Sequence, residues 1–301
     1  MPADPVRPAP VVYLDYTQAE LDAAYDQRVY APNREAIVAW YGAESAKVRE
    51  LLELRRGVPY GEGGDETLDI FPAKSGSGST FASPIHIHVH GGRWMLFTKD
   101  DESFIAPTFV NAGAACVIPD FTNIPGARIP GMVAQVKRAI AWTYRNAASF
   151  GGDPERIHLS GHSSGSHLAG VALLTDWEKE FGLPRDVVKS ALLVSGMYDL
   201  RPVMLSARAS YVKLSEDEVL AMSAILQPEK LGTPLTLVYG EKETPEFRRQ
   251  PKAFAKVLAA AGKPVEVVEV PGVNHFEILQ QLGDPASALA LRALGMMGLG
   301  R

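Results

Sequence analysis

The most informative stretch of the sequence is Arg156-Ile157-His158-Leu159-Ser160-Gly161-His162-Ser163-Ser164-Gly165-Ser166-His167-Leu168-Ala169. An apolar strand runs into Gly-x-Ser-x-Gly, and a helix follows directly. A serine at the tip of so sharp a turn has a strained backbone, and glycines two residues away on either side remove side chains that would collide there. We therefore predict that Ser163 is a nucleophile and that the amide of Ser164 points into the same space. A structural loop of small residues is the weaker interpretation, because it explains neither the apolar strand before the motif nor the helix after it.

On both sides of this turn, short apolar runs alternate with helical patterns from about Glu66 onward. This alternation predicts a mainly parallel central sheet flanked by helices on both faces. The expected strands are Thr67–Phe71, Ile85–Val89, Ala115–Pro119, Arg156–Ser160, Ser190–Ser195, Leu235–Tyr239 and Val265–Val270.

Two regions stand outside the alternation. Residues 15–56 read as helical, so we predict that residues 1–60 form an N-terminal helical segment on the core or at the active-site entrance. Residues 61–301 are expected to form the catalytic domain. Within it, residues 199–230 are too long for a simple connection and are a candidate lid or cap, with a helical piece at Ser215–Leu226. The Gly/Ser-rich segment Lys74–Ser83 predicts an exposed loop or hairpin.

A second turn, His90-Gly91-Gly92-Arg93-Trp94, ends the strand at Ile85–Val89. Glycines at such a turn leave backbone N–H groups uncovered, and such groups can stabilise the oxyanion of a tetrahedral intermediate. We predict an oxyanion hole made of the amides of Gly91, Gly92 and Ser164. Trp94 either lies near the acyl or leaving group or packs in the core.

The base of a serine nucleophile is expected late in the chain, after the last strand. His275 occupies that place in Val270-Pro271-Gly272-Val273-Asn274-His275-Phe276. The acid behind it is predicted to be Glu243, which follows the strand Leu235–Tyr239. Glu241 and Glu246 are close rivals, and Asp199, after the preceding strand, is the main alternative.

His86, His88 and His90 share one face of a strand and could in principle bind zinc. Ordinary buried, hydrogen-bonded histidines are the favoured interpretation, so we predict neither a metal nor a cofactor. Cys116 lies in an apolar run, where its thiol is expected to be inert.

The overall composition agrees with an enzyme acting on small molecules. The chain has 301 residues, 46% apolar and 22% charged, with a net charge of −5. No concentrated positive patch favours nucleic acid or an anionic membrane, and no apolar run reaches the length of a bilayer span. We expect a cytoplasmic protein with no membrane or nucleic-acid partner, and a homo-oligomer is left open.

Four segments together resemble a known family: His90–Trp94, Gly151–Ile157, Gly161–Ala169 and Gly240–Gln250. They are similar to the kynurenine formamidase (arylformamidase) branch of the α/β-hydrolases, which adjoins the hormone-sensitive-lipase-like esterases. The resemblance implies the α/β-hydrolase fold. It places the nucleophile on Ser163, the histidine on His275 and oxyanion donors on Gly91 and Gly92. The acid falls on Glu243, where the family usually has aspartate.

The resemblance implies a serine hydrolase that cleaves an N-formyl arylamine or a short acyl substrate through an acyl-enzyme. A general short-chain carboxylesterase is the first alternative. A catalytically silent ligand-binding protein of the same fold is the second. Trp94, Arg93, His162 and Phe276 are expected to line the pocket, and Arg93 or Arg128 is a candidate to bind a substrate carboxylate.

Overall fold

The computed structural model describes residues 9–74 and 82–299, which are arranged around an eight-stranded sheet. Its strand order is β10-β9-β8-β7-β5-β6-β4-β3. The strands from β10 to β6 pair in parallel, whereas β4 is antiparallel to both β6 and β3. The bounds are β3 (Arg55–Pro59), β4 (Thr67–Phe71), β5 (Ser83–Val89), β6 (Ala115–Pro119), β7 (Gly152–His162), β8 (Val188–Val194), β9 (Leu235–Gly240) and β10 (Val265–Val270).

All seven expected strands are present, and the predicted mainly parallel α/β sheet is confirmed. One strand of the sheet was missed: β3 begins at Arg55, where the region 15–56 that reads as helical ends. Its first residues are Arg55 and Arg56, and four of its five residues are exposed. An edge strand of this kind lacks the alternation of apolar and polar residues on which strand prediction depends. A small separate ribbon, β1 (Val11–Tyr13) with β2 (Tyr16–Thr17), was also not predicted.

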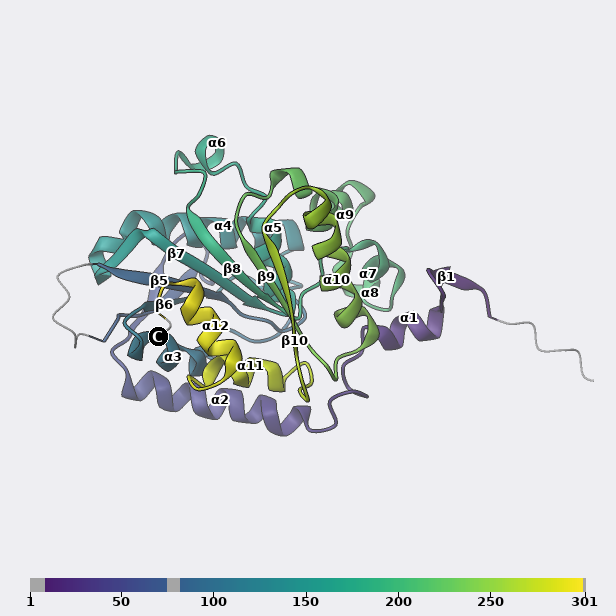
Figure 1. Ribbon diagram of the computed structural model, residues 1–301, viewed down its shortest axis with the longest axis horizontal. Helices are drawn as coiled ribbons and strands as arrows, with labels where there is room; N and C mark the ends of the chain where they lie inside the picture. Colours follow the sequence, from purple (N-terminus) through teal and green to yellow (C-terminus); the bar gives the residue numbers. More distant parts are fainter. Residues whose placement is uncertain (1–8, 75–81, 300–301) are drawn as a thin grey trace, which may run out of the picture.

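Helices cover both faces of the sheet (Figure 1). One face carries α4 (Ile129–Asn146), α5 (Ser164–Ala172) and α10 (Pro245–Ala260). The other carries α2 (Arg34–Leu51), α3 (Ala106–Asn111), α11 (Glu277–Gly283) and α12 (Ala288–Met296). The remaining helices are α1 (Gln18–Ala24), α6 (Trp177–Phe181), α7 (Arg201–Leu205), α8 (Ala209–Val212) and α9 (Glu216–Ala221), with short 3₁₀ turns at Ser103–Ile105, Ala147–Phe150, Ala224–Leu226 and Pro228–Lys230.

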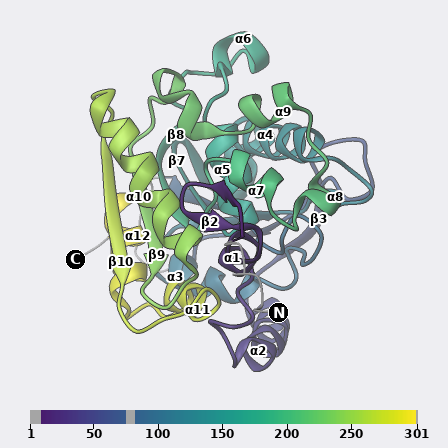
Figure 2. The same ribbon diagram turned by 90° about the vertical axis from the view of Figure 1, so that its right-hand side faces the viewer.

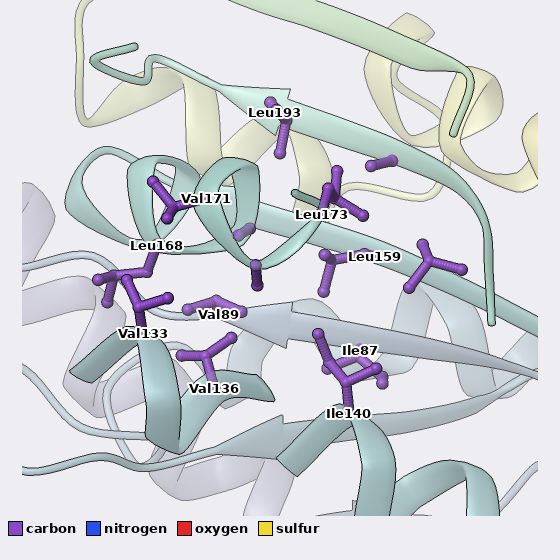
Figure 3. Close-up of a cluster of buried hydrophobic side chains, with 14 of the residues drawn as sticks. Ile87, Val89, Val133, Val136, Ile140, Leu159, Leu168, Val171, Leu173 and Leu193 are labelled. Carbon is purple, nitrogen blue, oxygen red and sulfur yellow. The ribbon is translucent and has the colours of Figure 1, made fainter. Parts of the chain in front are cut away.

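The larger core cluster lies between the sheet and the helices α4 and α5. Figure 3 shows Val133, Val136 and Ile140 of α4 facing Ile87 and Val89 of β5, with Leu159, Leu168, Val171, Leu173 and Leu193 completing the layer. β5 and β7 are covered on both faces, and every residue from Ile85 to Val89 and from Ile157 to His162 is buried, histidines included. This packing fixes the carboxyl ends of the two strands beside each other.

The order of the strands reverses at β5, since β6 lies on one side of it and β7 on the other. Crevices at such a switch point, beyond the carboxyl ends of parallel strands, are where open α/β sheets bind ligands. The turn at His90–Trp94 follows β5 and the turn at Ser163 follows β7, so both open at this point. Figure 2 faces this end of the molecule, where α1 and α7 lie in front of the sheet.

The N-terminal segment is tied to the last loop of the chain. The Tyr41 hydroxyl of α2 donates to the carbonyl of Phe276, and the Asn33 amide donates to Glu277 Oε1 (2.8 Å). The residues 199–230 form α7, α8, α9 and two 3₁₀ turns, in line with the helical character expected there. Most of the expected loop Lys74–Ser83 lies outside the described residues. Across the two described ranges, no helix has both the length and the apolar character that a bilayer span requires.

The buried layer in Figure 3 predicts a large cost for removing one of its side chains. Leu159 is 1% exposed, and Leu159→Ala is expected to lower the free energy of unfolding by about 2–5 kcal/mol, since it leaves a cavity. Leu291, which is 50% exposed, provides the control, and Leu291→Ala should change stability by about 0.5 kcal/mol or less. Urea titrations of both variants check this, and equal effects would contradict the packing described.

Candidate active site

Ser163 sits at a strained turn between β7 and α5. Its backbone has φ 56° and ψ −119°, a conformation that residues with side chains rarely adopt. The turn works because Gly165 has no side chain: a Cβ there would lie 2.1 Å from the carbonyl oxygen of Val89. At Gly161 a Cβ would lie 2.6 Å from the carbonyl oxygen of Gly165. The two glycines therefore let α5 start directly against the ends of β5 and β7.

A continuous line of hydrogen bonds connects the serine to a buried carboxylate. His275 Nε2 lies 2.9 Å from Ser163 Oγ, and His275 Nδ1 lies 2.9 Å from Glu243 Oε2. The side chain of Glu243 is buried, and its other oxygen accepts from the Ser195 hydroxyl (2.5 Å) and the Gly240 amide (2.7 Å). A carboxylate held in this way fixes the ring of the histidine and its Nδ1–H tautomer, which leaves Nε2 free to accept a proton from the serine.

The rival carboxylates all have other partners. Asp199 accepts two hydrogen bonds from the Arg201 side chain, at 2.9 and 2.8 Å. Glu246 pairs with Arg249 and accepts from the Tyr25 hydroxyl at 3.0 Å. Glu241 accepts from the Gly272 amide at 2.7 Å. Of the four candidates, only Glu243 is hydrogen-bonded to His275.

The amides near Ser163 differ in part from the predicted oxyanion hole. The Gly91 amide donates to Glu102 Oε1 (3.1 Å), so it is already paired, and the expectation of a free donor at this position needs correction. Among the residues described, the amides of Gly92 and Ser164 have no protein acceptor. Gly92 has φ +106°, and a Cβ there would lie 1.9 Å from the Leu96 carbonyl oxygen. Only glycine fits this turn, which leaves its amide uncovered.

Glu102, which the sequence analysis missed, is a fully buried carboxylate behind this turn. Its Oε2 lies 2.8 Å from His88 Nε2, and its Oε1 accepts from the Gly91 amide. Burial alone would raise the pKa of Glu102, but the hydrogen bond and charge of His88, helped by His162 and His90, hold it below its ordinary value. Within Asp100-Asp101-Glu102 the residue reads as part of a solvated acidic run, so no signal in the sequence distinguished it.

His86 and His88 of β5, and His90 directly after it, have protein partners. His88 Nδ1 and His86 Nε2 lie 2.7 and 2.8 Å from the hydroxyl of Ser160, and His90 Nδ1 lies 2.9 Å from the Gly91 carbonyl. Within residues 9–74 and 82–299, no group of three or more histidine, cysteine or acidic side chains is arranged to hold a metal ion. The thiol of Cys116 is buried, and burial raises its pKa.

Two more histidines support the catalytic turn from behind. His162 Nε2 donates to the carbonyl of His275 (2.9 Å), and burial together with the nearby charge of His275 lowers the pKa of His162 to about 4. His167 receives the Trp94 indole N–H at Nδ1 (3.2 Å) and reaches the Met222 carbonyl with Nε2 (2.9 Å). Because an indole N–H can only donate, His167 is held as the neutral Nε2–H tautomer.

A cleft of about 950 Å³ opens at Ser163. Three of the predicted pocket residues, Arg93, His162 and Phe276, line it. Trp94 does not: it is 0% exposed and packs edge-on against His167, so the core interpretation applies. The other walls come from residues 22–39 of the N-terminal segment, expected on the core or at the entrance, and from residues 206–211 of the candidate lid, although no single residue in either was named. Arg128 is not among the lining residues, and it forms an exposed ion pair with Glu218.

A family model described as BD-FAE matches residues 68–242, more than half of the chain. The chain belongs to the BD-FAE family. The matched segment contains the glycine turn after β5 and the serine turn after β7. This BD-FAE chain is also 30% identical to the kynurenine formamidase of Danio rerio over 290 residues, covering 93% of this chain and 96% of that protein. It is 32% identical to the kynurenine formamidase of Salmo salar over 258 residues, or 84% and 85% of the two chains.

Other relatives of the BD-FAE chain are esterases. It is 29% identical to Esterase LipQ of Mycobacterium tuberculosis, over 72% of this chain and 56% of that protein. Among solved structures, a putative thioesterase from Silicibacter matches with a TM-score of 0.78 and 27% identity, over 90% of this chain and 97% of the other. An esterase from Pyrobaculum calidifontis matches with a TM-score of 0.70 and 19% identity, over 90% and 95%. The α/β-hydrolase fold and the resemblance to the kynurenine formamidase branch are thus confirmed.

Replacing Glu102 with glutamine should destabilise the fold. The carboxylate accepts from two donors, His88 and Gly91, whereas an amide offers only one acceptor oxygen and turns an NH₂ group toward one of them. We expect Glu102→Gln to lower the free energy of unfolding by about 1–3 kcal/mol in urea titrations. The control is Asp100→Asn, on the same loop but 58% exposed, for which about 1 kcal/mol or less is expected. Equal stability of Glu102→Gln and the native chain would contradict this role.

Stability should fall on acidification because of the buried neutral histidines. Burial lowers the pKa of His158, His162 and His167 to about 4, whereas His90 beside Asp120 has a raised pKa and acts in the opposite sense. The unfolded chain therefore binds more protons at the first three sites between pH 6.5 and 4, and their stabilisation, complete above pH 6.5, is lost across that window.

His167 tests this expectation by itself. The His167→Gln variant should take up about one proton fewer on unfolding near pH 5.5. The slope of its unfolding free energy against pH should therefore be smaller by about 1.4 kcal/mol per pH unit. Urea titrations at several pH values give both slopes. If the variant keeps the slope of the native chain, His167 is not held neutral in the fold.

Proposed function

We propose that this protein is a serine hydrolase that cleaves a small amide or ester through an acyl-enzyme, with an N-formyl arylamine as the first substrate class. The observation that carries the proposal is the line Ser163–His275–Glu243, with both hydrogen bonds at 2.9 Å, at the opening of the cleft. A hydroxyl, an imidazole and a carboxylate in this order are what nucleophilic acyl transfer requires.

Each residue has a distinct task in the proposed reaction. Ser163 Oγ attacks the substrate carbonyl while His275 Nε2 takes its proton, and Glu243 stabilises the resulting imidazolium. The amides of Gly92 and Ser164 are assigned to the oxyanion. Gly91 supports them through its bond to Glu102 instead of donating to the substrate. His275 then protonates the leaving amine or alcohol, and water activated by the same histidine releases the acyl group.

The choice of substrate class rests on the relatives. Two proteins named kynurenine formamidase match nearly the whole chain, which favours a formylated arylamine. A short-chain carboxylesterase is the second candidate, favoured by the similarity to Esterase LipQ. A silent ligand-binding protein would have no need of a carboxylate that accepts from both Ser195 and Gly240 to hold a histidine in place. A small-molecule substrate and a location in the cytoplasm stay predictions, and the second is checked by cell fractionation.

Hydrolysis of N-formylkynurenine beside p-nitrophenyl acetate tests the proposal. We expect turnover of both, with the larger kcat/KM for the formamide, because the two relatives that match most of the chain are named kynurenine formamidases. Ser163→Ala should abolish both activities. Turnover that survives in Ser163→Ala would contradict the mechanism. A preference of the native enzyme for the ester would favour the carboxylesterase alternative and leave the roles of Ser163, His275 and Glu243 unchanged.

The acid is tested by a matched pair of variants two residues apart. Glu243→Gln should lower kcat by about 10³–10⁴-fold, since the histidine loses the carboxylate that fixes its tautomer. Glu241→Gln removes an exposed carboxylate that bonds only to the Gly272 amide, and it should stay within about threefold of the native rate. Equal losses in the two variants would contradict the assignment of Glu243.

A further inference from the structure

The cleft beside Ser163 contains a buried positive charge that takes no part in the hydrogen bonds among Ser163, His275 and Glu243. Arg208, in the insertion, lines the cleft and is only 7% exposed. Its Nη2 donates to the Tyr25 carbonyl (2.8 Å), and its Nη1 lies 4.0 Å from the sulfur of Met197. No carboxylate among the described residues pairs with it.

An unpaired guanidinium in such a place is costly. Moving a charge out of water without a counter-charge is unfavourable, and buried charges are ordinarily paired. Burial lowers the pKa of Arg208, although it stays fully protonated at neutral pH. Neutral rings partly cover the cation, with the Tyr25 and Phe247 centroids at 5.6 and 5.7 Å from Cζ. Two ring faces stabilise a cation less than a carboxylate does, so the site lacks an anion.

Other polar groups of the cleft point to a ligand at the same place. The buried Oε1 of Gln27 has no hydrogen-bond partner among the described residues. The buried Tyr211 hydroxyl lies close enough to Arg208 to influence its pKa but has no partner with hydrogen-bond geometry among those residues, and both Gln27 and Tyr211 line the cleft. A second cation, Arg93, lies over the Tyr211 ring at 5.6 Å and is exposed in the cleft without an ion pair in the described chain. Buried polar atoms are nearly always satisfied, and a bound molecule can satisfy them here.

Arg208 lies on the side of Ser163 where the leaving group of the substrate is expected. Phe247, against which Arg208 packs, lies edge-on to the His275 ring with centroids 4.7 Å apart. In the proposed reaction His275 delivers a proton to the leaving group, so the leaving group lies on this side of Ser163. Arg208 is therefore placed to meet a group carried by the leaving amine or alcohol.

We infer that Arg208, assisted by Arg93 and the Tyr211 hydroxyl, forms a subsite for a carboxylate on the leaving group of the substrate. This inference rests on the proposed function for the direction of the substrate, while the anion subsite itself rests on the buried charge. A planar guanidinium can donate two parallel hydrogen bonds to a carboxylate, and a bond of this kind inside a cleft is stronger than one in water. Substrates that carry the anion should be selected over neutral ones of the same shape.

Matched substrates measure this selection. The ortho, meta and para formamidobenzoates are compared with the corresponding formamidobenzamides, which replace the carboxylate by a neutral amide of similar size. The native enzyme should prefer the acid by about 10- to 100-fold in kcat/KM for at least one isomer. Arg208→Gln should remove most of that preference, because kcat/KM falls much further for the benzoates than for the benzamides. Arg128→Gln, outside the cleft, should keep the full preference.

A binding measurement separates this inference from the proposed function. Calorimetry with benzoate and benzamide on Ser163→Ala protein needs no turnover, and benzoate should bind more tightly, with the difference lost on adding Arg208→Gln. If the native enzyme hydrolyses none of the substrates but Ser163→Ala still binds benzoate more tightly than benzamide, only the proposed reaction is contradicted. Equal binding of benzoate and benzamide, or a preference unchanged by Arg208→Gln, would overturn the anion subsite.

The integrity of the variants is checked by circular dichroism. If Arg208→Gln does not fold, the same two comparisons are made with Arg208→Lys, which keeps the charge but cannot donate in a fork, and with Arg93→Gln. Both should lower the preference for the carboxylate, and full retention in both would contradict the subsite.

Discussion

The close approach of α5 to the ends of β5 and β7 is the constraint on which the rest of the site depends. A single methyl group at Gly165 would meet the carbonyl oxygens of Val89 and His90 at 2.1 and 2.3 Å. Without this close approach of α5 to the two strands, the serine turn could not adopt its strained backbone. The Ser164 amide would then not face the glycine turn after β5. The chemistry of the site is thus set first by the space between backbones, and only then by side chains.

Around this turn, some buried polar groups hold the backbone in place, and others belong to the proposed catalytic residues. Glu243 and Glu102 are both buried carboxylates, yet one bonds to the ring that accepts the serine proton and the other to a backbone amide and a structural histidine. His162, between them, is held neutral by burial and bonds to the backbone of His275. His162 therefore lies next to both halves of the site: it bonds to the base through the His275 carbonyl, while its Nδ1 lies 4.0 Å from Glu102 Oε1, beyond hydrogen-bond distance.

The sequence predicted the parts of this arrangement that have local signals. Gly161, Ser163 and Gly165 lie within one turn, and His275 follows a recognisable strand, so their places could be predicted from the pattern alone. Glu243 was preferred over Asp199 by chain order and resemblance, and the structure brings it to His275. Glu102 and Arg208 could not be predicted, because their burial comes from segments distant in the sequence. Gly91 was assigned a free amide because its acceptor lies eleven residues further on, at the end of the same connection between β5 and the 3₁₀ turn Ser103–Ile105, and only the fold brings the two together.

Residues far apart along the chain line the cleft, and this has a consequence for how the protein is made. Residues 22–39 are synthesised long before His275 and Phe276, which line the same cleft. Part of the N-terminal segment finds its partner earlier, because Tyr41 of α2 packs against Phe104. A nascent chain that ends before His275 nevertheless has no finished cleft. The order of synthesis thus makes completion of the cleft a late step of folding.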